Sequence, residues 1–313
     1  MSDQIVIAYA KHYASNVVHL SQQKSSYFGD KVRNEHQNVE QDFYDRIGSV
    51  TAQLKAGRQE DVAYSNTPHS RRRVVTKKYF YADTTDKDDK VKTVIDPNSA
   101  YVQAAVMALN RAKDDVVIAA ALGSSYGGVD GGTPVVLPDS QKVAAHDGST
   151  LTGVNMNVKT LRAVSKKFNA NEVDKSIKRY VAMGSSQLEA LLGQTEVTSS
   201  DYNSIKALVM GDVDTFMGFK FVFSERLPRS STNITYNKDS GVVGSGTGTI
   251  TAANSRRCFA WAEDGLLLAT AEELFTSIDI LPSKHFLSQI YASQNYGATR
   301  MEEEKVVEII CSE

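Results

Sequence analysis

The clearest periodic pattern along the chain lies between residues 97 and 122. Apolar residues recur there at intervals of three and four, which places them on one face of a helix. They are Val102, Ala105, Val106, Leu109, Ala112, Val116 and Ala119. Asp96 is a suitable N-cap, Pro97 suits the first helical position, and Gly123 stands where a helix would end. The spacing predicts one helix on the order of 40 Å long, at about 1.5 Å per residue.

The first 95 residues carry weaker patterns. Loose helical spacing from Ile5 to Phe28, and a shorter stretch from Phe43 to Leu54, predict amphipathic helices too thin to build a core. Residues 59–65 and 71–83 flank the turn-forming sequence 66–70, and the second run is rich in Val, Thr, Tyr and Phe, so strand, turn and strand are predicted. A lone hairpin is marginally stable in water, so these segments require a surface to rest on.

From Leu151 onward the pattern becomes a mixture of helices and strands. Helices are predicted at 158–168, 187–192 and around 205–209. Strands are predicted at 135–137, 179–183, 219–223, 258–262, 266–269, 275–280, 286–292 and 305–310. Two glycine-rich stretches, 123–132 and 241–251, are predicted to be loops.

Composition limits the class of protein. The 313 residues can bury one sizeable core or two modest ones, and 41% apolar with 23% charged residues is ordinary for a globular chain. A net charge of −2 excludes a general polyanion binder but leaves room for a local basic patch. Cys258 and Cys311 are the only cysteines, which argues against a disulfide scaffold or a cysteine zinc site and fits a reducing cytoplasm.

Targeting signals are weak. The sequence from Met1 to Gln4 has no basic stretch leading into an apolar run, so no signal peptide is expected. The longest apolar run, Val116 to Leu122, is far shorter than the roughly 20 residues of a membrane-spanning helix. We therefore expect a soluble protein that stays in the cell that makes it, with no membrane partner.

The glycine-rich and serine motifs do not match catalytic patterns. Neither Gly244–Gly248 nor Gly123–Gly132 ends in the Gly-Lys-Ser/Thr of a phosphate-binding loop. The sequence Met183-Gly184-Ser185-Ser186 lacks the GxSxG pattern of a nucleophile elbow, so Ser185 or Ser186 is expected to cap a helix that starts near Gln187.

Metal ligands are not grouped either. The six histidines are scattered, and the acidic stretch from Asp83 to Asp89 is interrupted by Lys87 and lacks the glycine and closing glutamate of a calcium loop. We therefore predict no catalytic residue, no cofactor and no metal, and a protein that is not an enzyme.

One local charge anomaly remains. Five cations fall within eight residues, and the acidic stretch 83–89 follows almost at once. They are Arg71, Arg72, Arg73, Lys77 and Lys78. Aromatic residues do not interleave with the arginines, as they would in many nucleic-acid sites. Adjacent patches of opposite charge favour contact between subunits, where they fix register and orientation.

The order of short motifs resembles the major capsid proteins of tailed bacteriophages, the phage capsid protein family with the Hong Kong 97-like fold. The motifs extend from about Arg46 to the C-terminus. They include Thr67-Pro68 before Arg72-Arg73-Val74, Tyr79-Phe80-Tyr81-Ala82-Asp83, Asp88-Asp89, Asp96-Pro97-Asn98-Ser99-Ala100-Tyr101, Ala108-Leu109-Asn110-Arg111-Ala112-Lys113-Asp114, Leu191-Leu192, Thr198-Ser199-Ser200-Asp201-Tyr202, Gly211-Asp212-Val213, Phe216-Met217-Gly218-Phe219-Lys220-Phe221, Leu227-Pro228 and Tyr296-Gly297-Ala298-Thr299-Arg300. No single motif is decisive, but their order and spacing together are specific.

The resemblance implies an α+β fold in five segments. These are an N-terminal arm (1–58), an E-loop that overlaps a neighbouring subunit (59–95), a peripheral domain (96–150) with its spine helix at 97–122, an axial domain (151–280), and strands that return to the peripheral domain (281–313). The subunit interface on the E-loop would include Asn66, Thr67 and Pro68 together with Arg71, Arg72, Arg73, Lys77 and Lys78.

The resemblance also implies partners and a location. The chain would assemble with itself into hexamers and pentamers of an icosahedral shell around double-stranded DNA, which it would contact non-specifically. Portal, scaffolding or cement proteins are further expected partners, with assembly in the host bacterial cytoplasm and residence in the virion. Two alternatives stay open: an encapsulin-type nanocompartment shell, and a soluble α/β enzyme that binds phosphate through Gly123–Gly132.

Overall fold

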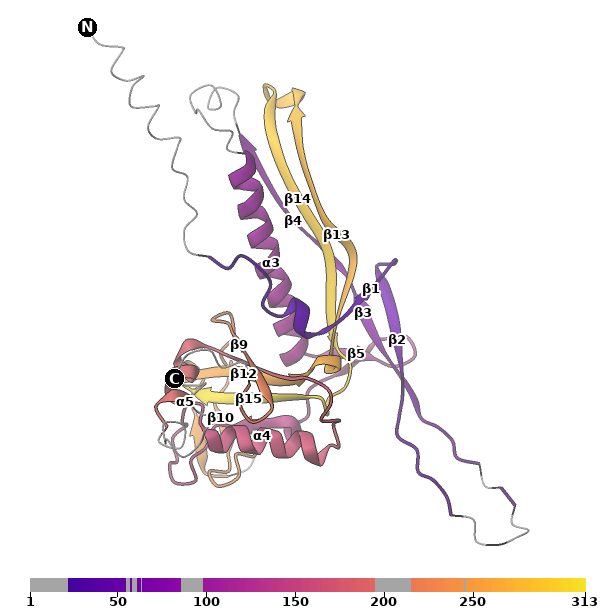
Figure 1. The fold of residues 1–313 in the computed structure, drawn as a ribbon, viewed down its shortest axis with the longest axis vertical. Coiled ribbons are helices and arrows are strands. Elements are labelled where there is room, and N and C mark those ends of the chain that lie inside the picture. The colour runs from indigo at the N-terminus through magenta and orange to yellow at the C-terminus, as the bar shows by residue number, and fades with distance from the viewer. Residues whose placement is uncertain are drawn as a thin grey trace.

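The computed structural model of the chain describes residues 22–54, 57, 61–62, 64–85, 98–194, 215–244 and 246–313. They form three parts that we name the stalk, the compact part and the projecting hairpin (Figure 1). The molecule is therefore long, with a globular end, an elongated end and a separate extension.

The stalk consists of one long helix on one long sheet. Helix α3 spans Asn98–Leu122 and packs mainly on β14, with further contacts to β4 and β13. The four-stranded sheet has the order β1-β13-β14-β4. Its strands are β1 (Arg33–His36), β13 (Leu266–Leu281), β14 (Leu287–Arg300) and β4 (Lys77–Thr85). The predicted long helix is confirmed over the described residues, while Asp96 and Pro97 lie outside them.

Small residues let α3 approach the sheet closely. Ala105 and Leu109 of the helix pack on Ala292 of β14, and all three side chains are buried. Tyr296 of β14 stacks on Tyr79 of β4 with ring centroids 4.6 Å apart, and its hydroxyl donates to the Leu109 carbonyl oxygen at 3.3 Å. Ala105 and Leu109 of the predicted face therefore lie on β14, whereas Ala119 of that face is exposed. Val117, Ile118 and Ala121, which the predicted face did not include, are buried as well.

The compact part is built on a five-stranded sheet with the order β7-β15-β12-β8-β9. Its strands are β7 (Lys142–Ala144), β15 (Val306–Ser312), β12 (Ser255–Ala262), β8 (Arg179–Met183) and β9 (Phe219–Phe223). Helices α4 (Val158–Ala170) and α5 (Ser185–Leu192) complete it, with a small pair of strands, β10 (Ile234–Tyr236) and β11 (Gly248–Ile250). Single-turn helices lie at Gly29–Lys31, Asp139–Gln141, Ala252–Asn254, Glu263–Gly265 and Pro282–Lys284.

The core of the compact part centres on Trp261 of β12. Its ring lies 4.9 Å from that of Phe259, 5.4 Å from that of Tyr180 and 5.6 Å from that of Phe28. Its indole nitrogen donates to the Lys31 carbonyl oxygen at 2.8 Å. Residues 28–31, which belong to the N-terminal segment 22–36, therefore pack into the same core as the sheet.

The projecting hairpin belongs to a third sheet, with the order β2-β3-β5-β6. Its strands are β2 (Gln41–Ile47), β3 (His69–Val75), β5 (Ser125–Gly127) and β6 (Thr133–Val135). Beyond the sheet, β2 and β3 lead into the loop 48–68, whose described residues run away from the stalk and the compact part (Figure 1). The Gly48 amide donates to the Pro68 carbonyl oxygen at 2.8 Å and closes the base of this loop.

The structure corrects several predictions in the first part of the chain. Phe43 lies in strand β2, so the predicted helix over 43–54 is wrong there. The partner of β3 is β2, while β4 pairs with β14, and the described residues of 59–65 form no strand. The physical reason is that these runs are short, so whether they form strands and which strands they pair with depend on residues far away in the sequence. Predictions at 5–21 and 205–209 lie outside the described residues.

The later segments are mostly as predicted, with shifted edges. The strands at 179–183 and 219–223 and the helix at 158–168 are confirmed. The two strands predicted at 266–269 and 275–280 are one strand, β13, with register irregularities between Thr270 and Phe275. The boundary placed at residue 280 therefore falls inside β13, and β15 joins the compact part and not the stalk.

The helix after β8 begins differently from the prediction. Ser185 and Ser186 are already helical, and Gly184 is the extended residue in front of them. The Gly184 amide donates to the side-chain oxygen of Gln187 at 3.2 Å, and the Ser185 amide donates to the Glu225 carboxylate at 2.5 Å. The predicted serine cap is therefore wrong, because Gln187 and Glu225 satisfy the free amides.

Candidate functional site

The most unusual surface is the loop of the projecting hairpin, because its apolar side chains face solvent. Leu54 is 94% exposed and Tyr64 is 93% exposed. Ile47, Val50 and Val62 are also exposed. Water contact with so much apolar surface is unfavourable at about 25 cal/mol per Å². Exposed apolar residues gathered on one loop in this way are typical of a binding surface.

The root of the hairpin is held rigidly by a buried ion cluster. Arg72 of β3 is buried and lies 2.5 Å from the Glu303 carboxylate. Arg46 of β2 lies 3.7 Å from the same carboxylate and also donates to the Met301 carbonyl oxygen. Burial lowers the pKa of Arg72, although Glu303 opposes that shift. The hairpin is thus attached to the chain just after β14.

Arg300 joins this cluster to helix α3. It is fully buried, and its guanidinium donates to the carbonyl oxygens of Ala121, Gly123 and Val135 at 2.9 to 3.0 Å. Ala121 and Gly123 lie at the C-terminal end of the helix, where carbonyl groups lack helical partners and a cation is favoured. One arginine therefore ties the stalk helix to the base of the hairpin.

The predicted interface cations occupy different environments. Arg72 is the buried anchor described above. Arg71 pairs with Asp45 at 2.9 Å, Arg73 lies 5.1 Å over the Tyr126 ring, and Lys78 pairs with Glu272 at 3.3 Å. Lys77 is exposed. Of the five cations that are close in the sequence, Arg72 therefore stabilises the subunit from inside, and the other four lie nearer the surface.

The turn residues of the predicted site lie at the base of the loop. Asn66 and Pro68 are exposed and Thr67 is partly buried. A side-chain carbon on Gly48 would come within 2.7 Å of the Pro68 ring, so the two strands approach closely here. These three residues therefore stand where the loop leaves the sheet.

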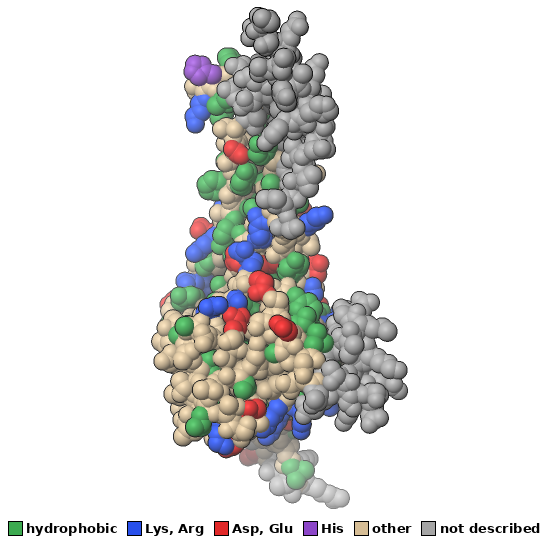
Figure 2. All heavy atoms as spheres, turned by 90° about the vertical axis from the view of Figure 1, so that its left-hand side faces the viewer, with side chains coloured by type: hydrophobic (Ala, Val, Ile, Leu, Met, Phe, Trp, Pro, Cys, Tyr) green, Lys and Arg blue, Asp and Glu red, His purple; other side chains and the backbone are tan. Residues whose placement is uncertain are grey.

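A second apolar surface lies along the outer part of the stalk. Phe275 and Phe80, both at least half exposed, flank the ring of Tyr291 at centroid distances of 6.4 and 6.2 Å. Leu274, Ile278 and Ile280 of β13 are also exposed. Figure 2 shows hydrophobic side chains interspersed with charged ones along the narrow upper part. Single-sequence reasoning missed this surface, because it placed β13 within a compact domain.

Strand β13 also has a free edge within the described chain. β1 pairs with it only from Leu267 to Thr270, and no described strand lies on that edge from Glu272 to Leu281. An unpaired strand edge offers backbone donors and acceptors to another chain. The stalk therefore presents both apolar side chains and unpaired backbone groups.

The N-terminal segment is fixed to the stalk by Asp114 of α3. This buried carboxylate accepts hydrogen bonds from the Ser26 hydroxyl at 2.5 Å and from the Tyr27 amide at 3.0 Å. The Phe28 amide adds a longer bond of 3.3 Å, and the Gln23 side chain adds another. Residues 23–28 therefore lie against α3, and the chain then continues into β1.

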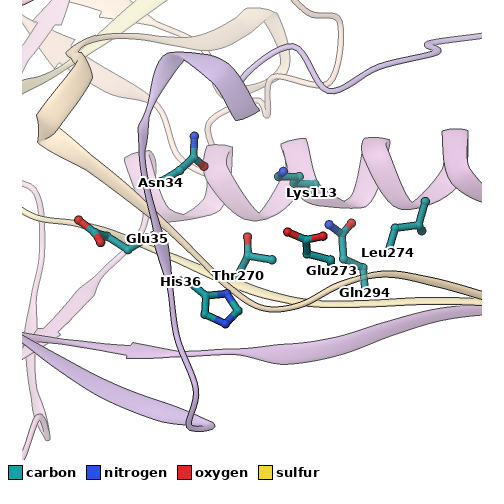
Figure 3. Close-up of a pocket in the computed structure, with 8 residues that line it drawn as sticks. All are labelled: Asn34, Glu35, His36, Lys113, Thr270, Glu273, Leu274 and Gln294. Carbon is teal, nitrogen blue, oxygen red and sulfur yellow. The ribbon is translucent and has the colours of Figure 1, made fainter.

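An open groove of about 430 Å³ lies where β1, α3 and β13 meet (Figure 3). Lys113 reaches it from α3, Glu273 and Thr270 from β13, and His36 from β1. No group of three potential metal ligands occurs among the described residues, this groove included.

The glycine-rich stretch 123–132, predicted to be a loop, includes strand β5 at Ser125–Gly127, and only residues 128–132 form the turn to β6. Gly128 and Gly131 have φ of 87° and 63°, which favours glycine, and a side-chain carbon on Gly131 would meet Arg73 at 2.7 Å. The turn lies against the base of the projecting hairpin. Positive φ and close packing therefore account for Gly128 and Gly131 without a phosphate.

In the described ranges from 22 to 313, no helix is long and apolar enough to cross a membrane.

Solved structures of phage capsids share this fold. The capsid of cyanophage P-SCSP1u aligns with a TM-score of 0.69 at 14% identity, covering 94% of this chain and 90% of that chain. The capsid of Ralstonia phage GP4 aligns with a TM-score of 0.69 at 8% identity, covering 95% and 94%. The capsid of Helicobacter pylori bacteriophage KHP30 aligns with a TM-score of 0.65 at 14% identity, covering 95% of this chain and 94% of that chain. The predicted α+β, Hong Kong 97-like fold is confirmed.

The sequence comparisons reach the same family. No curated protein matches the chain. The family model described as phage capsid protein matches residues 5–313, which is nearly the whole length. The chain belongs to the phage capsid protein family.

Proposed function

We propose that this protein is the major capsid protein of a tailed bacteriophage, which self-assembles into the hexamers and pentamers of an icosahedral shell around double-stranded DNA. The observation that carries this proposal is the loop 48–68, whose Leu54 and Tyr64 side chains are more than nine-tenths exposed. These side chains require a partner surface, and in a shell every subunit has neighbours. The family and the fold favour a structural role over an enzymatic one.

The interface we propose joins the projecting hairpin of one subunit to the stalk of the next. Its residues are Asn66, Thr67, Pro68, Arg71, Arg73, Lys77 and Lys78. Arg72 is excluded because it is buried and paired within its own subunit. Such a contact uses different patches on its two sides, and contacts of this kind close into rings when the rotation allows.

The proposed segments follow the parts of the fold. The N-terminal arm continues to β1, and the E-loop is the loop 48–68 with the strands β2 and β3 that carry it. The peripheral domain is the stalk with α3 as its spine helix, and the axial domain is the compact part. The strand β15 is assigned to the axial domain because it lies inside that sheet, between β7 and β12.

Partners and location follow from the same proposal. The assembled subunits would meet a portal and, in some phages, scaffolding or cement proteins, and would contact the packaged DNA non-specifically. Assembly would take place in the host bacterial cytoplasm, and the protein would reside in the virion capsid.

Two alternative functions can be distinguished from this proposal. One predicts a particle with other contents, and the other predicts that no particle forms. An encapsulin-type shell would enclose cargo enzymes in place of a genome. A phosphate-binding α/β enzyme would act as a monomer or small oligomer, but its proposed loop at 123–132 is packed against Arg73. The packed glycines disfavour the enzyme.

Electron microscopy of the purified full-length protein tests the proposal. We expect closed shells or rings of five and six, and extraction of filled particles should give DNA and not enzymes. A protein of 34.3 kDa that stays monomeric as its concentration is raised would overturn the proposal.

A variant tests the interface itself. Replacing Arg71, Arg73, Lys77 and Lys78 with Ser should block shell closure while the monomer keeps its circular dichroism spectrum and melting temperature. The control replaces four exposed cations outside the proposed interface, Arg33, Lys175, Lys178 and Lys284, with Ser. Normal shells from the first variant would contradict this interface.

A further inference from the structure

Helix α4 of the compact part has an unusually one-sided charge. Its 13 residues contain four cations and no acidic residue, although acidic residues outnumber basic ones, 37 to 35, in the whole chain. The cations are Lys159, Arg162, Lys166 and Lys167. The opposite face is apolar and buries Leu161, Val164 and Phe168 in the core. Three of the four cations, Lys159, Arg162 and Lys166, are therefore on the exposed side of the helix.

Three of these cations form one exposed row. Lys159, Arg162 and Lys166 are exposed and follow the spacing i, i+3 and i+7 of a single helix face. The row extends for about 10 Å along the helix axis at about 1.5 Å per residue. Lys167 points elsewhere, because it is half-buried and donates to the Ser140 carbonyl oxygen.

The row has no acidic partner in the described chain. None of the three cations forms a salt bridge with a described residue, whereas Lys142, Lys178 and other surface cations do. Lys159 donates only to the Asp147 backbone oxygen, at 3.1 Å. The Asp147 carboxylate is occupied by the amides of Ser149 and Thr150, each at 2.8 Å. No acidic side chain among the described residues therefore neutralises the positive charge of the row.

The arrangement also opposes helix stability. Lys159 sits in the first turn, where the helix dipole disfavours a cation, and this turn carries no acidic residue. Arg162 and Lys166 are four residues apart, a spacing at which like charges repel. Both features lower the stability of the isolated subunit. An external polyanion would reverse both effects.

The helix is also accessible. It runs along the lower edge of the compact part, with the sheet on its other side (Figure 1). Figure 2 shows Lys and Arg side chains at the lower end of the compact part. A DNA duplex carries about one phosphate per 1.7 Å of its axis, so a 10 Å row faces several phosphates. Long cationic side chains on a rigid helix suit contact with phosphates and carry no base specificity.

We propose that the row Lys159, Arg162 and Lys166 is a phosphate-contact surface through which the compact part touches the packaged DNA duplex. This inference rests on the proposed function and adds to it the residues that face the genome. It places the α4 side of the compact part on the inner surface of the shell. An acidic surface of a neighbouring subunit is the rival occupant that the experiment must separate.

The test uses full-length protein with Lys159→Gln, Arg162→Gln and Lys166→Gln, held below its assembly concentration. Its binding to a 30-base-pair duplex is measured by fluorescence anisotropy at several salt concentrations. Losing three phosphate contacts should reduce the slope of log affinity against log salt by about 2.7. Between 0.05 and 0.2 M salt, the unsubstituted protein should therefore lose about 40-fold more affinity than the variant.

The matched control removes three cations elsewhere, with Arg33→Gln, Lys178→Gln and Lys284→Gln, and should keep the original slope. In filled particles, ultraviolet crosslinking followed by mass spectrometry should find nucleotides on peptides from α4. An unchanged slope in the α4 variant, with no such crosslinks, would overturn the proposal. If the slope is unchanged and the α4 variant fails to form closed shells, the row instead contacts an acidic surface of a neighbouring subunit, and the proposal is overturned. Absence of shells from the unsubstituted protein would instead contradict the proposed function.

Discussion

The guanidinium of Arg72 and the carboxylate of Glu303 lie 2.5 Å apart, although 231 positions separate them in the sequence. Arg72 is buried in β3, and Glu303 follows directly on the stalk strand β14. Arg300, also buried, lies 3.6 Å from the same carboxylate and binds the end of α3. The direction of the projecting hairpin is therefore set by a buried charge cluster at its root.

Replacing Glu303 with Gln should destabilise the subunit strongly. Removing one partner of a buried ion pair leaves the remaining charge uncompensated, which typically costs about 3–5 kcal/mol. Here Arg72 and Arg300 would both lose their carboxylate. Urea unfolding followed by circular dichroism would measure the change. Asp45→Asn, which breaks the exposed pair with Arg71, is the control and should cost about 0–1 kcal/mol. Equal effects of the two variants would contradict the anchoring role.

Replacing Leu54 and Tyr64 with Ser should leave the isolated subunit unaffected and impair assembly. Both side chains are more than 90% exposed, so their removal should change the free energy of unfolding by less than about 0.5 kcal/mol. Static light scattering at increasing concentration measures shell formation. Val129→Ser, at another exposed apolar position on the subunit, is the control. Unimpaired assembly of the double variant would show that the loop does not bury these residues.

The local periodicity of apolar residues was sufficient to predict those elements that bury one face against a single core. The long helix α3, helix α4 and strand β8 were predicted because their apolar residues follow a regular spacing against one core. Strand β2 was mistaken for a helix, because its alternation is short and Phe43 is only partly buried. Its pairing with β3 depends on contacts about 26 positions away.

The candidate site shows the same limit more clearly. The five cations at 71–78 could be identified from the sequence, but only the fold separates the buried Arg72 from its partly exposed neighbours Arg71 and Arg73. Glu303 holds the hairpin through Arg72, 231 positions away, and Asp114 holds residues 23–28 from 86–91 positions away, so neither contact has a local signal in the sequence. The aromatic group on the stalk could not be found before β4 and β14 were known to be neighbours.

Replacing Asp114 with Asn should release the N-terminal segment. Its carboxylate accepts from the Ser26 hydroxyl and from the amides of Tyr27 and Phe28, and hydrogen bonds to a charged group contribute about 1.5–3 kcal/mol each. Because Asn keeps one acceptor oxygen, we expect a net loss of about 2–3 kcal/mol. Hydrogen exchange should become faster over residues 26–36. Asp115→Asn, which breaks an exposed pair with Arg226, is the control and should leave exchange there unchanged.

Alkaline pH should weaken the stalk through Tyr296. Burial raises the pKa of this phenol above its ordinary value of about 10, and the neighbouring Tyr79 and Asp115 add to the shift. The folded protein therefore holds the proton more tightly than the unfolded chain. This contribution is fully present below pH 10 and is lost as the pH rises from there toward the folded pKa, at up to about 1.4 kcal/mol per pH unit.

Tyr296→Phe isolates this effect because it keeps the stacking ring and removes the titrating hydroxyl. At neutral pH the variant should be slightly less stable, since it lacks the hydrogen bond to the Leu109 carbonyl oxygen. Above pH 10 the order should reverse, because only the unsubstituted protein loses the contribution of this phenol. Melting temperatures of both proteins from pH 7 to pH 11.5 would reveal a crossing. Parallel curves across that range would mean that the phenol titrates in the folded subunit as it does in the unfolded chain.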